Sequence, residues 1–446
     1  MPRAGNRVRQ GRRVIILRPP AVAVVGAGVA GLKAAESLLR TGVPVSVTVF
    51  GDEAHYPYNR TALSKHRIDG ADAIELPGAR TLDQVLAAGQ SLTWRRADAV
   101  RSVDLRAGSL QDAEGSAHAF DRLVVATGVR ARVLADASGT CVIHDHVTMR
   151  SVEDAVHVHR RLRAGESIRI AGSGFIACEM ASMAVEAGCD VVMERVPDGG
   201  PFRGLLGREV SVALAGWYSR RGVAFVDTDA RLRGGASAGG RSDSSGECAR
   251  TPTTGSTSLA SRPLHLEAVG GVPNVEWLAG NDLDLSDGIL VDDRMRVVGH
   301  RDAFAAGDIA RRPEALLGGA SCRSGFWKNA VDTGRLAGRA VARSLGADVQ
   351  LGAAHGKAHT AVRILGLRIQ VGGLPGIADA RRVVRGSLDR VGEGVVIRYS
   401  RGGRDVGVAY IDSSARYMED YLRILGEMAP GASAAPASVG SGTATA

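Results

Sequence analysis

Two glycine-rich segments have the spacing of turns that bind the pyrophosphate of a dinucleotide. The first contains Gly26, Gly28 and Gly31, and the second contains Gly172 and Gly174 in the same relation. In such a turn the first glycine permits a tight bend and the second lets the backbone approach the phosphates. The helix that follows directs free N–H groups and a positive dipole end at them. Each segment is therefore predicted to hold one dinucleotide.

Acidic residues stand where the ribose of each dinucleotide would bind. Asp52 and Glu53 follow the strand predicted after the first turn, and either can accept hydrogen bonds from the adenosine ribose. Glu194 has the corresponding place in the second unit, where a carboxylate favours the free 2′-hydroxyl of NADH. The adjacent Arg195 could instead accept the 2′-phosphate of NADPH. The sequence thus favours NADH and leaves NADPH possible.

Each glycine turn lies between a short apolar run and a segment of helical periodicity. Strand, turn, helix and second strand follow in the same order twice, roughly 145 residues apart, which predicts two doubly wound α/β nucleotide-binding units. A further buried strand at residues 122–125 ends at Ala126, Thr127 and Gly128. The predicted strands of the two units are residues 21–25, 45–50, 167–171 and 190–193, and the predicted helices are residues 32–40 and 178–187.

The other segments predict a small α+β domain and several poorly structured stretches. Gly and Ser dominate residues 231–263, which predicts a flexible insertion. Residues 1–19 form a basic arm and residues 429–446 a tail, and both are expected to be disordered. Alternating strand patterns occupy residues 367–371, 382–384, 395–399 and 406–411, and a helix is predicted at residues 417–426.

Composition narrows the classes of protein and of partner. The net charge of +9 favours acidic partners. The five cysteines, of which Cys141 is the first, show neither CxxC nor zinc-site spacing, which indicates reduced thiols in a cytoplasmic protein and no bound metal. No apolar stretch reaches the roughly twenty residues that a membrane helix needs. We expect neither a membrane nor a nucleic acid as partner, and the oligomeric state stays open.

An ordered set of motifs resembles the FAD-dependent ferredoxin reductases of oxygenase systems, of the putidaredoxin reductase type. The resemblance begins at a PYxRxxLSK-like segment and extends over nearly everything from residue 21 to residue 428. Together the motifs are far more specific than any one of them. They are residues 57–65, 126–132, 149–155, 174–179, 271–274, 305–310 and 327–330.

The resemblance implies an FAD-binding domain of residues 20–143 and 268–345. An NAD(P)H-binding domain of residues 144–267 would be inserted into it, and residues 346–428 would form the C-terminal α+β domain. The cofactor-binding residues implied by the turns and the resemblance together are Gly26, Gly28, Ala30, Gly31, Asp52, Glu53, Arg60, Lys65, Val100, Ala126, Thr127, Gly128, Arg150, Gly172, Gly174, Phe175, Ile176, Glu179, Glu194, Gly307, Asp308 and Trp327.

Two of these residues are expected to assist the chemistry. The resemblance implies that Lys65 lies near flavin N5 and is paired with Glu179, close to the nicotinamide. A cation at that position would stabilise the negative charge that arrives with a hydride, and its carboxylate partner would keep it oriented. The absence of any cysteine before Cys141 disfavours disulfide reductase and cysteine-based peroxidase activity.

The function implied is NADH-dependent reduction of FAD, with electrons passed to an acidic iron–sulfur ferredoxin that supplies a P450 or Rieske oxygenase. Two alternatives remain: a tailoring flavoprotein that acts directly on a small organic substrate, and an FAD- and NAD-binding sensor that does not turn over. Thr360 to Arg363 stand where the family usually has a Phe-Trp-Ser-Asp run, which puts contacts to the flavin rim and the partner in doubt. The insertion at residues 231–263 replaces the strand meander usual in the nicotinamide domain.

Overall fold

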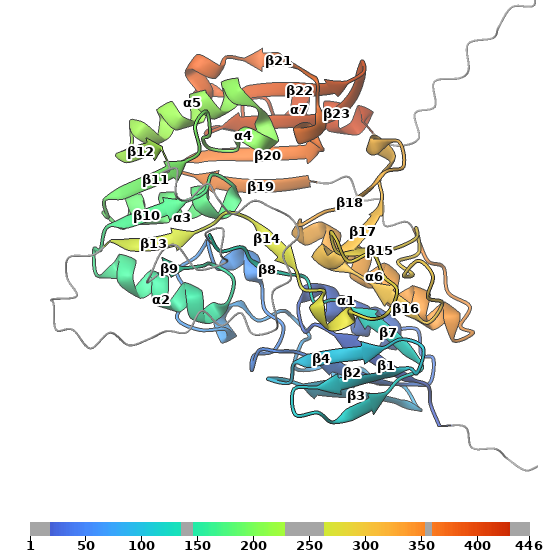
Figure 1. The fold of residues 1–446 in the computed structure, drawn as a ribbon. Helices are drawn as coiled ribbons and strands as arrows, with labels where there is room; N and C mark the ends of the chain where they lie inside the picture. The colour runs from blue at the N-terminus through green and yellow to red at the C-terminus, as the bar shows by residue number, and fades with distance from the viewer. Residues whose placement is uncertain (1–17, 135–145, 228–262, 353–358, 429–446) are drawn as a thin grey trace, which may run out of the picture.

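Two five-stranded parallel sheets form the centre of the protein (Figure 1). The computed structural model describes residues 18–134, 146–227, 263–352 and 359–428. In the first sheet the strand order is β16-β7-β1-β2-β3, and β1 pairs in parallel with β7 and β2. These strands are β1 (Ala21–Val25), β2 (Val45–Phe50), β3 (Gln90–Arg95), β7 (Arg122–Val125) and β16 (Ala303–Ala305).

The second parallel sheet is built from the chain between the two parts of the first. Its order is β12-β11-β10-β13-β9, so β10 is central and continues into the second glycine turn. The helices of this unit are α2 (Val152–Arg163), α3 (Phe175–Glu186), α4 (Arg203–Leu206) and α5 (Arg208–Ser219). Its strands are β9 (His146–Val147), β10 (Ile168–Ala171), β11 (Val191–Arg195), β12 (Val223–Asp227) and β13 (Leu264–Glu267).

A five-stranded antiparallel sheet near the C-terminus lies beside the second parallel sheet (Figure 1). Its order is β19-β20-β23-β22-β21, and helix α7 (Met418–Glu427) packs on one face. The strands are β19 (His359–Ile364), β20 (Leu367–Gly373), β21 (Ala380–Gly386), β22 (Val395–Arg401) and β23 (Arg404–Asp412). The predicted α/β class, with a small C-terminal α+β unit, is confirmed.

Shorter strands complete the described part of the chain. A three-stranded meander consists of β4 (Val100–Asp104), β5 (Ser109–Asp112) and β6 (Ala117–Ala119). The paired strands β8 (Val129–Ala131) and β14 (Gly271–Pro273) carry the chain between the two parallel sheets. A third small sheet contains β15 (Ile289–Leu290), β17 (Ala310–Pro313) and β18 (Ser321–Arg323).

Helices α1 (Val29–Leu39) and α6 (Trp327–Ser344) pack closely because glycines remove side chains from their contact. A Cβ on Gly334 would lie 2.5 Å from the carbonyl oxygen of Ala30, and one on Gly338 would lie 2.2 Å from that of Ala34. Both distances are shorter than real carbon–oxygen contacts. The glycines of α6 therefore set how closely α1, the helix that follows the first glycine turn, approaches α6.

The hydrophobic core has two main clusters, the first around the first parallel sheet and the second around the second parallel sheet and the C-terminal sheet, and a small third cluster under α7. The second cluster joins Ile170 and Met180 of the second parallel sheet unit with Ile369 of the C-terminal sheet. It also includes Leu63 and Ile68, which lie far earlier in the sequence, before strand β9 begins that unit. The segment of residues 58–68 is thus packed against the second unit, although it follows the first sheet's strand β2.

Strands β1 and β2 have their predicted bounds, whereas β10 begins one residue later than predicted and β11 spans Val191–Arg195 instead of residues 190–193. Two other predictions also need correction. Helices α1 and α3 each begin three residues before the predicted starts at residues 32 and 178, because the glycine turn leads directly into the first helical turn. Strand β19 was not predicted at all. The predicted disorder of residues 1–19, 231–263 and 429–446 falls, apart from residues 18, 19 and 263, outside the described residues. No helix in the described ranges is long and apolar enough to cross a membrane.

Candidate active site

The first glycine turn leaves open space in front of helix α1. Gly26 has a φ of +113°, and a Cβ there would lie 2.2 Å from the carbonyl oxygen of Ala126. By contrast, a Cβ on Gly28 would meet no atom within 4 Å. Gly28 is the N-cap of α1 and provides no side-chain cap for the helix N–H groups. These N–H groups are therefore available to the phosphates of a dinucleotide.

The second turn repeats this geometry at the start of α3. Gly172 has a φ of +129°, and a Cβ there would lie 2.3 Å from the carbonyl oxygen of Ala268. The Cβ position of Gly174 is open, as at Gly28. Ile176 in the first turn of α3 is 37% exposed, which is unusual for a large apolar side chain in this protein. A nucleotide lying across this helix start would cover it.

Phe175, the first residue of α3, links the two glycine-turn regions. Its ring centroid lies 5.0 Å from that of Phe202 and 6.2 Å from that of Phe326, both in edge-to-face geometry. Phe326 is the N-cap of α6 and precedes Trp327, which packs against the first core. The aromatic contact brings the second turn and the start of α6 together, as a two-nucleotide site requires.

The acids predicted at the ribose positions have different surroundings. Glu53 pairs with Arg60 and accepts a hydrogen bond of 2.6 Å from the Tyr58 hydroxyl, whereas Asp52 is exposed. Of the two, Asp52 is the acid left available to a ribose. Glu194 is buried, and its Oε1 lies 2.7 Å from Arg169 Nη2.

Arg150 and Asp308 are the charged residues best placed to hold an absent ligand. Burial lowers the pKa of Arg150, with Arg60 acting in the same direction, and burial raises the pKa of Asp308. Both side chains are only partly buried by area, and neither makes a hydrogen bond within the described residues. A Cβ on Gly128 would lie 3.5 Å from the Arg150 guanidinium. A half-buried cation and acid whose side chains make no hydrogen bond in the described structure, beside a glycine turn, fit the phosphates and hydroxyls of FAD.

The remaining predicted FAD contacts surround the same region. Gly307 has a φ of +79°, and a Cβ there would lie 2.8 Å from the Cβ of Ala30. Thr127 Oγ1 donates a hydrogen bond of 2.9 Å to the carbonyl oxygen of Asn274, which fixes the end of β7. Val100 begins β4 and packs on the first core. The end of β7 lies against Gly26 of the first turn, and Gly307 lies against Ala30; that these residues bind FAD stays a prediction.

Lys65 and Glu179 are brought together across the two units. Lys65 Nζ lies 3.5 Å from Glu179 Oε1, and the Glu179 side chain is 6% exposed. Burial raises the pKa of Glu179, while the Ser64 hydroxyl and the Lys65 ammonium act to lower it. Ser64 Oγ also donates a hydrogen bond to Glu179 Oε2. The catalytic role of this pair stays a prediction, but the pairing itself is present.

Two residues of the site escaped the sequence analysis. Ser64 was noted only as part of a motif, next to Lys65, and its bond to Glu179 spans 115 positions in sequence. Arg169, the partner of Glu194, lies on the neighbouring strand β10, two residues before its end. Strand alternation places the side chains of Arg169 and Ala171 on the same face of the sheet. Because Ala171 is the register partner of Glu194, the Arg169–Glu194 ion pair could be inferred once the strands and their register were known.

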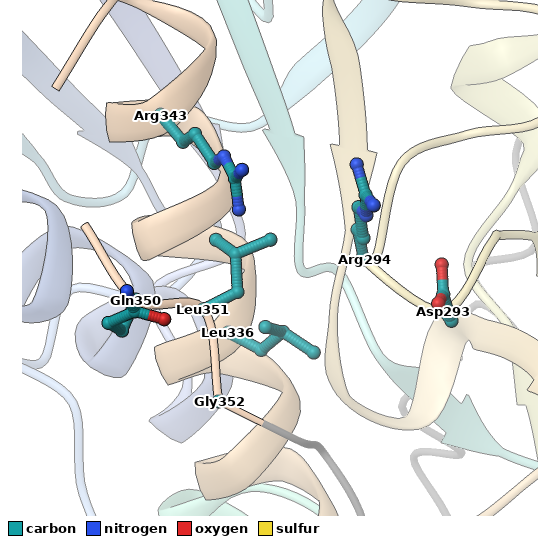
Figure 2. Close-up of a pocket in the computed structure, with 7 residues that line it drawn as sticks. All are labelled: Asp293, Arg294, Leu336, Arg343, Gln350, Leu351 and Gly352. Atoms are coloured by element: carbon teal, nitrogen blue, oxygen red, sulfur yellow. The ribbon is translucent and has the colours of Figure 1, made fainter. Parts of the chain in front are cut away.

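A separate hollow of about 320 Å³ lies away from these residues (Figure 2). Leu336 and Arg343 of α6 face Arg294 across it. It contains none of the predicted site residues and its charged side chains are exposed, so it is not the candidate active site. Within the described residues, no group of three or more His, Cys, Asp or Glu side chains could hold a metal ion.

A family model for pyridine nucleotide-disulphide oxidoreductases matches residues 20–334, which include both glycine turns, Lys65 and Glu179. The chain belongs to this family. Its members are NAD(P)H-dependent flavin oxidoreductases, and the family binds FAD and a nicotinamide nucleotide. The suspected family membership and the oxidoreductase class are thereby confirmed.

Curated relatives include several reductase components of oxygenase systems. The ferredoxin–NAD(+) reductase component of the p-cumate 2,3-dioxygenase system of Pseudomonas putida is 30% identical, over 70% of this chain and 72% of that protein. Rhodocoxin reductase of Rhodococcus erythropolis is 27% identical over 70% of each chain. The solved structure of a covalent putidaredoxin reductase–putidaredoxin complex contains a chain of the same fold. It is 21% identical, with a TM-score of 0.72, over 92% of this chain and 94% of that chain.

Proposed function

We propose that this protein is an NADH-dependent, FAD-containing reductase that passes electrons to an acidic iron–sulfur ferredoxin, which in turn supplies an oxygenase. The observation that carries the proposal is the Lys65–Glu179 pair, which joins the loop after β2 to the second turn of α3. Relatives named as ferredoxin–NAD(+) reductase components support the same acceptor.

In this proposal each glycine turn binds one nucleotide. The N–H groups of α1 and the guanidinium of Arg150 hold the pyrophosphate of FAD, and Asp52 accepts hydrogen bonds from its ribose. The N–H groups of α3 hold the pyrophosphate of NADH, and Glu194 accepts from its 2′-hydroxyl. Bound FAD would supply the redox chemistry, taking a hydride from NADH and releasing electrons one at a time.

Lys65 and Glu179 would supply charge rather than covalent chemistry. The Lys65 ammonium stabilises negative charge that develops where the two nucleotides meet, and Glu179 holds that ammonium in one orientation. Phe175, held between Phe202 and Phe326, excludes water at the start of α3. Each of these residues is fixed before substrate arrives, which is the arrangement that electrostatic stabilisation requires.

A second candidate, a flavoprotein that acts directly on a small organic substrate, is favoured by strand β19. This strand contains residues 360–363, where the family usually has an aromatic run, and it places Val362 and Ile364 in the second core. Its outward residues, Ala361 and Arg363, are exposed. The surface offered to a protein partner there differs from the one the resemblance implies.

The decisive experiment is an electron-transfer assay with the FAD-loaded protein. Under anaerobic conditions NADH should bleach the flavin, and an added [2Fe–2S] ferredoxin should accelerate NADH-dependent reduction of cytochrome c. If a small quinone or aromatic compound is reduced stoichiometrically while ferredoxins have no effect, the second candidate is correct. A protein that stays colourless after incubation with FAD contradicts both.

A further inference from the structure

Ser64 bonds to a buried carboxylate that has no other hydroxyl donor in the described structure. Its Oγ donates to Glu179 Oε2, and both residues are buried, with 5% and 6% of their surface exposed. The two belong to different units, because Ser64 follows strand β2 and Glu179 lies in α3. A hydroxyl buried at such a junction must be hydrogen-bonded, and the acceptor here is an acid that the proposed function uses.

The two oxygens of Glu179 have separate partners. Oε2 accepts from Ser64, and Oε1 lies 3.5 Å from Lys65 Nζ. Rotation of the carboxylate about its terminal bond would exchange the two oxygens or break the serine bond. The Ser64 hydroxyl therefore fixes the plane of the carboxylate and turns Oε1 toward Lys65. Since Ser64 and Lys65 are consecutive, one loop conformation sets both contacts.

That loop is itself held rigidly. The N–H of Lys65 donates to the carbonyl oxygen of Ala62 at 3.1 Å, and Leu63 is 2% exposed in the second core. Three residues after Lys65, the N–H of Ile68 donates to Nδ1 of the buried His159 at 3.2 Å. The serine hydroxyl is thus presented from a backbone anchored on α2 and packed on the second core, and not from a mobile surface loop.

The titratable groups around Glu179 come from three elements. Lys65 and His66 of the loop lower its pKa, and burial, the largest cause, raises it. Cys178 of α3 and Tyr218 of α5 also lie near. Burial raises the pKa of Cys178 to about 12 and that of Tyr218 well above its usual value, so both stay neutral at physiological pH. Ser64 is the neutral donor that opposes the cost of burying the Glu179 charge.

We propose that Ser64 is a positioning residue for the hydride transfer: it turns Glu179 toward Lys65 and favours the charged form of that carboxylate. The proposal rests on the proposed function, since it assigns a part in that reaction to a residue outside the predicted set. Ser64 touches neither nucleotide in this scheme and acts only through Glu179.

The first test compares Ser64→Ala with Ser64→Thr, which restores a hydroxyl, and with Ser182→Ala as a matched control. Ser182 is a buried serine on the same helix whose hydroxyl donates to the backbone carbonyl of Cys178 at 3.0 Å and also interacts with the Tyr218 side chain. The rate constant for flavin reduction by saturating NADH is measured in a stopped-flow instrument from pH 5 to pH 9. As the pH is lowered, the rate constant in Ser64→Ala should begin to fall at a pH about one unit higher than in the unaltered protein, because a hydrogen bond to a charged group is lost. Ser64→Thr should restore much of the profile, and Ser182→Ala should leave it in place.

The second test does not depend on turnover. Protein loaded with FAD and labelled with ¹³C at glutamate carboxyl carbons is titrated without NADH, and the Glu179 resonance is identified by its loss in Glu179→Gln. The midpoint of this resonance should rise in Ser64→Ala. If it does so although NADH does not reduce the flavin, the proposed function is wrong and the role of Ser64 in ionising Glu179 stands. If NADH reduces the flavin normally and neither midpoint nor rate profile moves, the positioning role is wrong. If Ser64→Ala fails to bind FAD, the same measurements are made on Ser64→Cys. Its thiol has a similar side-chain volume to the serine hydroxyl group but is a weak hydrogen-bond donor, so the same outcomes decide the proposal.

Discussion

The guanidinium of Arg169 lies 2.7 Å from Glu194 Oε1, across the adjacent parallel strands β10 and β11. Arg169 also donates through Nε to the same oxygen at 2.8 Å. The other oxygen, Oε2, is buried and has no hydrogen-bond partner in the described structure. One oxygen of Glu194 is therefore fixed by the protein, and the other is left to a ligand at the end of the strand.

This arrangement predicts that NADH is preferred over NADPH. Glu194→Ala should lower kcat/KM for NADH by about tenfold, which corresponds to the free energy of one hydrogen bond. It should lower kcat/KM for NADPH much less. Arg195→Ala is the matched control, because Arg195 already pairs with Asp227 at 3.3 Å. Steady-state kinetics with both nucleotides measure the effect. A higher kcat/KM for NADPH in the unaltered protein would show that Arg195 governs the choice.

Lys65→Ala should slow flavin reduction by about 10²-fold, the usual effect of removing one donor that stabilises developing charge. Glu179→Gln should slow it less, because Lys65 keeps its charge and loses only its orientation. Rapid mixing with NADH under anaerobic conditions isolates this step from the later ones. Equal rates in Lys65→Ala and the unaltered protein would remove Lys65 from the mechanism.

Electron transfer to an acidic ferredoxin should weaken steeply with ionic strength, because the net charge of +9 attracts it at long range. Salt screens such attraction beyond roughly 10 Å at 0.1 M. Flavin reduction by NADH should change far less, since its contacts are short and enclosed. Both rates are measured at increasing NaCl concentration, and Lys65→Ala should leave the slope for ferredoxin unchanged. If the two rates fell equally with NaCl concentration, long-range electrostatic attraction of the ferredoxin would be contradicted.

His159 should make the protein less stable in weak acid. Burial lowers the pKa of His159, whose Nδ1 must be unprotonated to accept from the N–H of Ile68. Below about pH 6.5 the unfolded chain takes up a proton that the folded chain resists, so stability falls as the pH drops from there toward the lowered pKa. Urea unfolding at pH 7.5, 6.5 and 5.5 should show a smaller loss in His159→Gln than in the unaltered protein. His157→Gln, two residues earlier on α2, should not reduce the loss.

Gly338→Ala should destabilise the protein by about 1–3 kcal/mol, the cost of forcing atoms into a filled contact. The new methyl would have to displace α6 from the carbonyl oxygen of Ala34. Gly426→Ala is the control: it lies in helix α7 with nothing within 4 Å of its Cβ position, and should stabilise slightly. Thermal unfolding, followed together with FAD retention, measures both. Equal behaviour of the two variants would show that the α1–α6 contact can relax.

The sequence was most informative where a local rule decides the structure. Strands β1, β2 and β7 have their predicted bounds because buried apolar residues predominate in each and a turn or glycine follows it. Strand β19 was missed because only Val362 and Ile364 are buried, which gives too short an alternation to stand out. The resemblance implied the Lys65–Glu179 pair, but the bonds of Ser64 to Glu179 and of Arg169 to Glu194 were not inferred, since each depends on how separate elements meet in the folded protein.

The packing of residues 58–68 on the second core bears on how this oxidoreductase could be engineered. A chimaera that exchanged the second parallel-sheet unit at the predicted boundaries of residues 144–267 would leave Leu63 and Ile68 facing a foreign surface. It would also separate Ser64 and His159 from the residues that they bond. The transplantable module therefore consists of three pieces of chain: the unit itself, the C-terminal sheet and this loop. Shuffling experiments on such enzymes should place their crossover points outside all three.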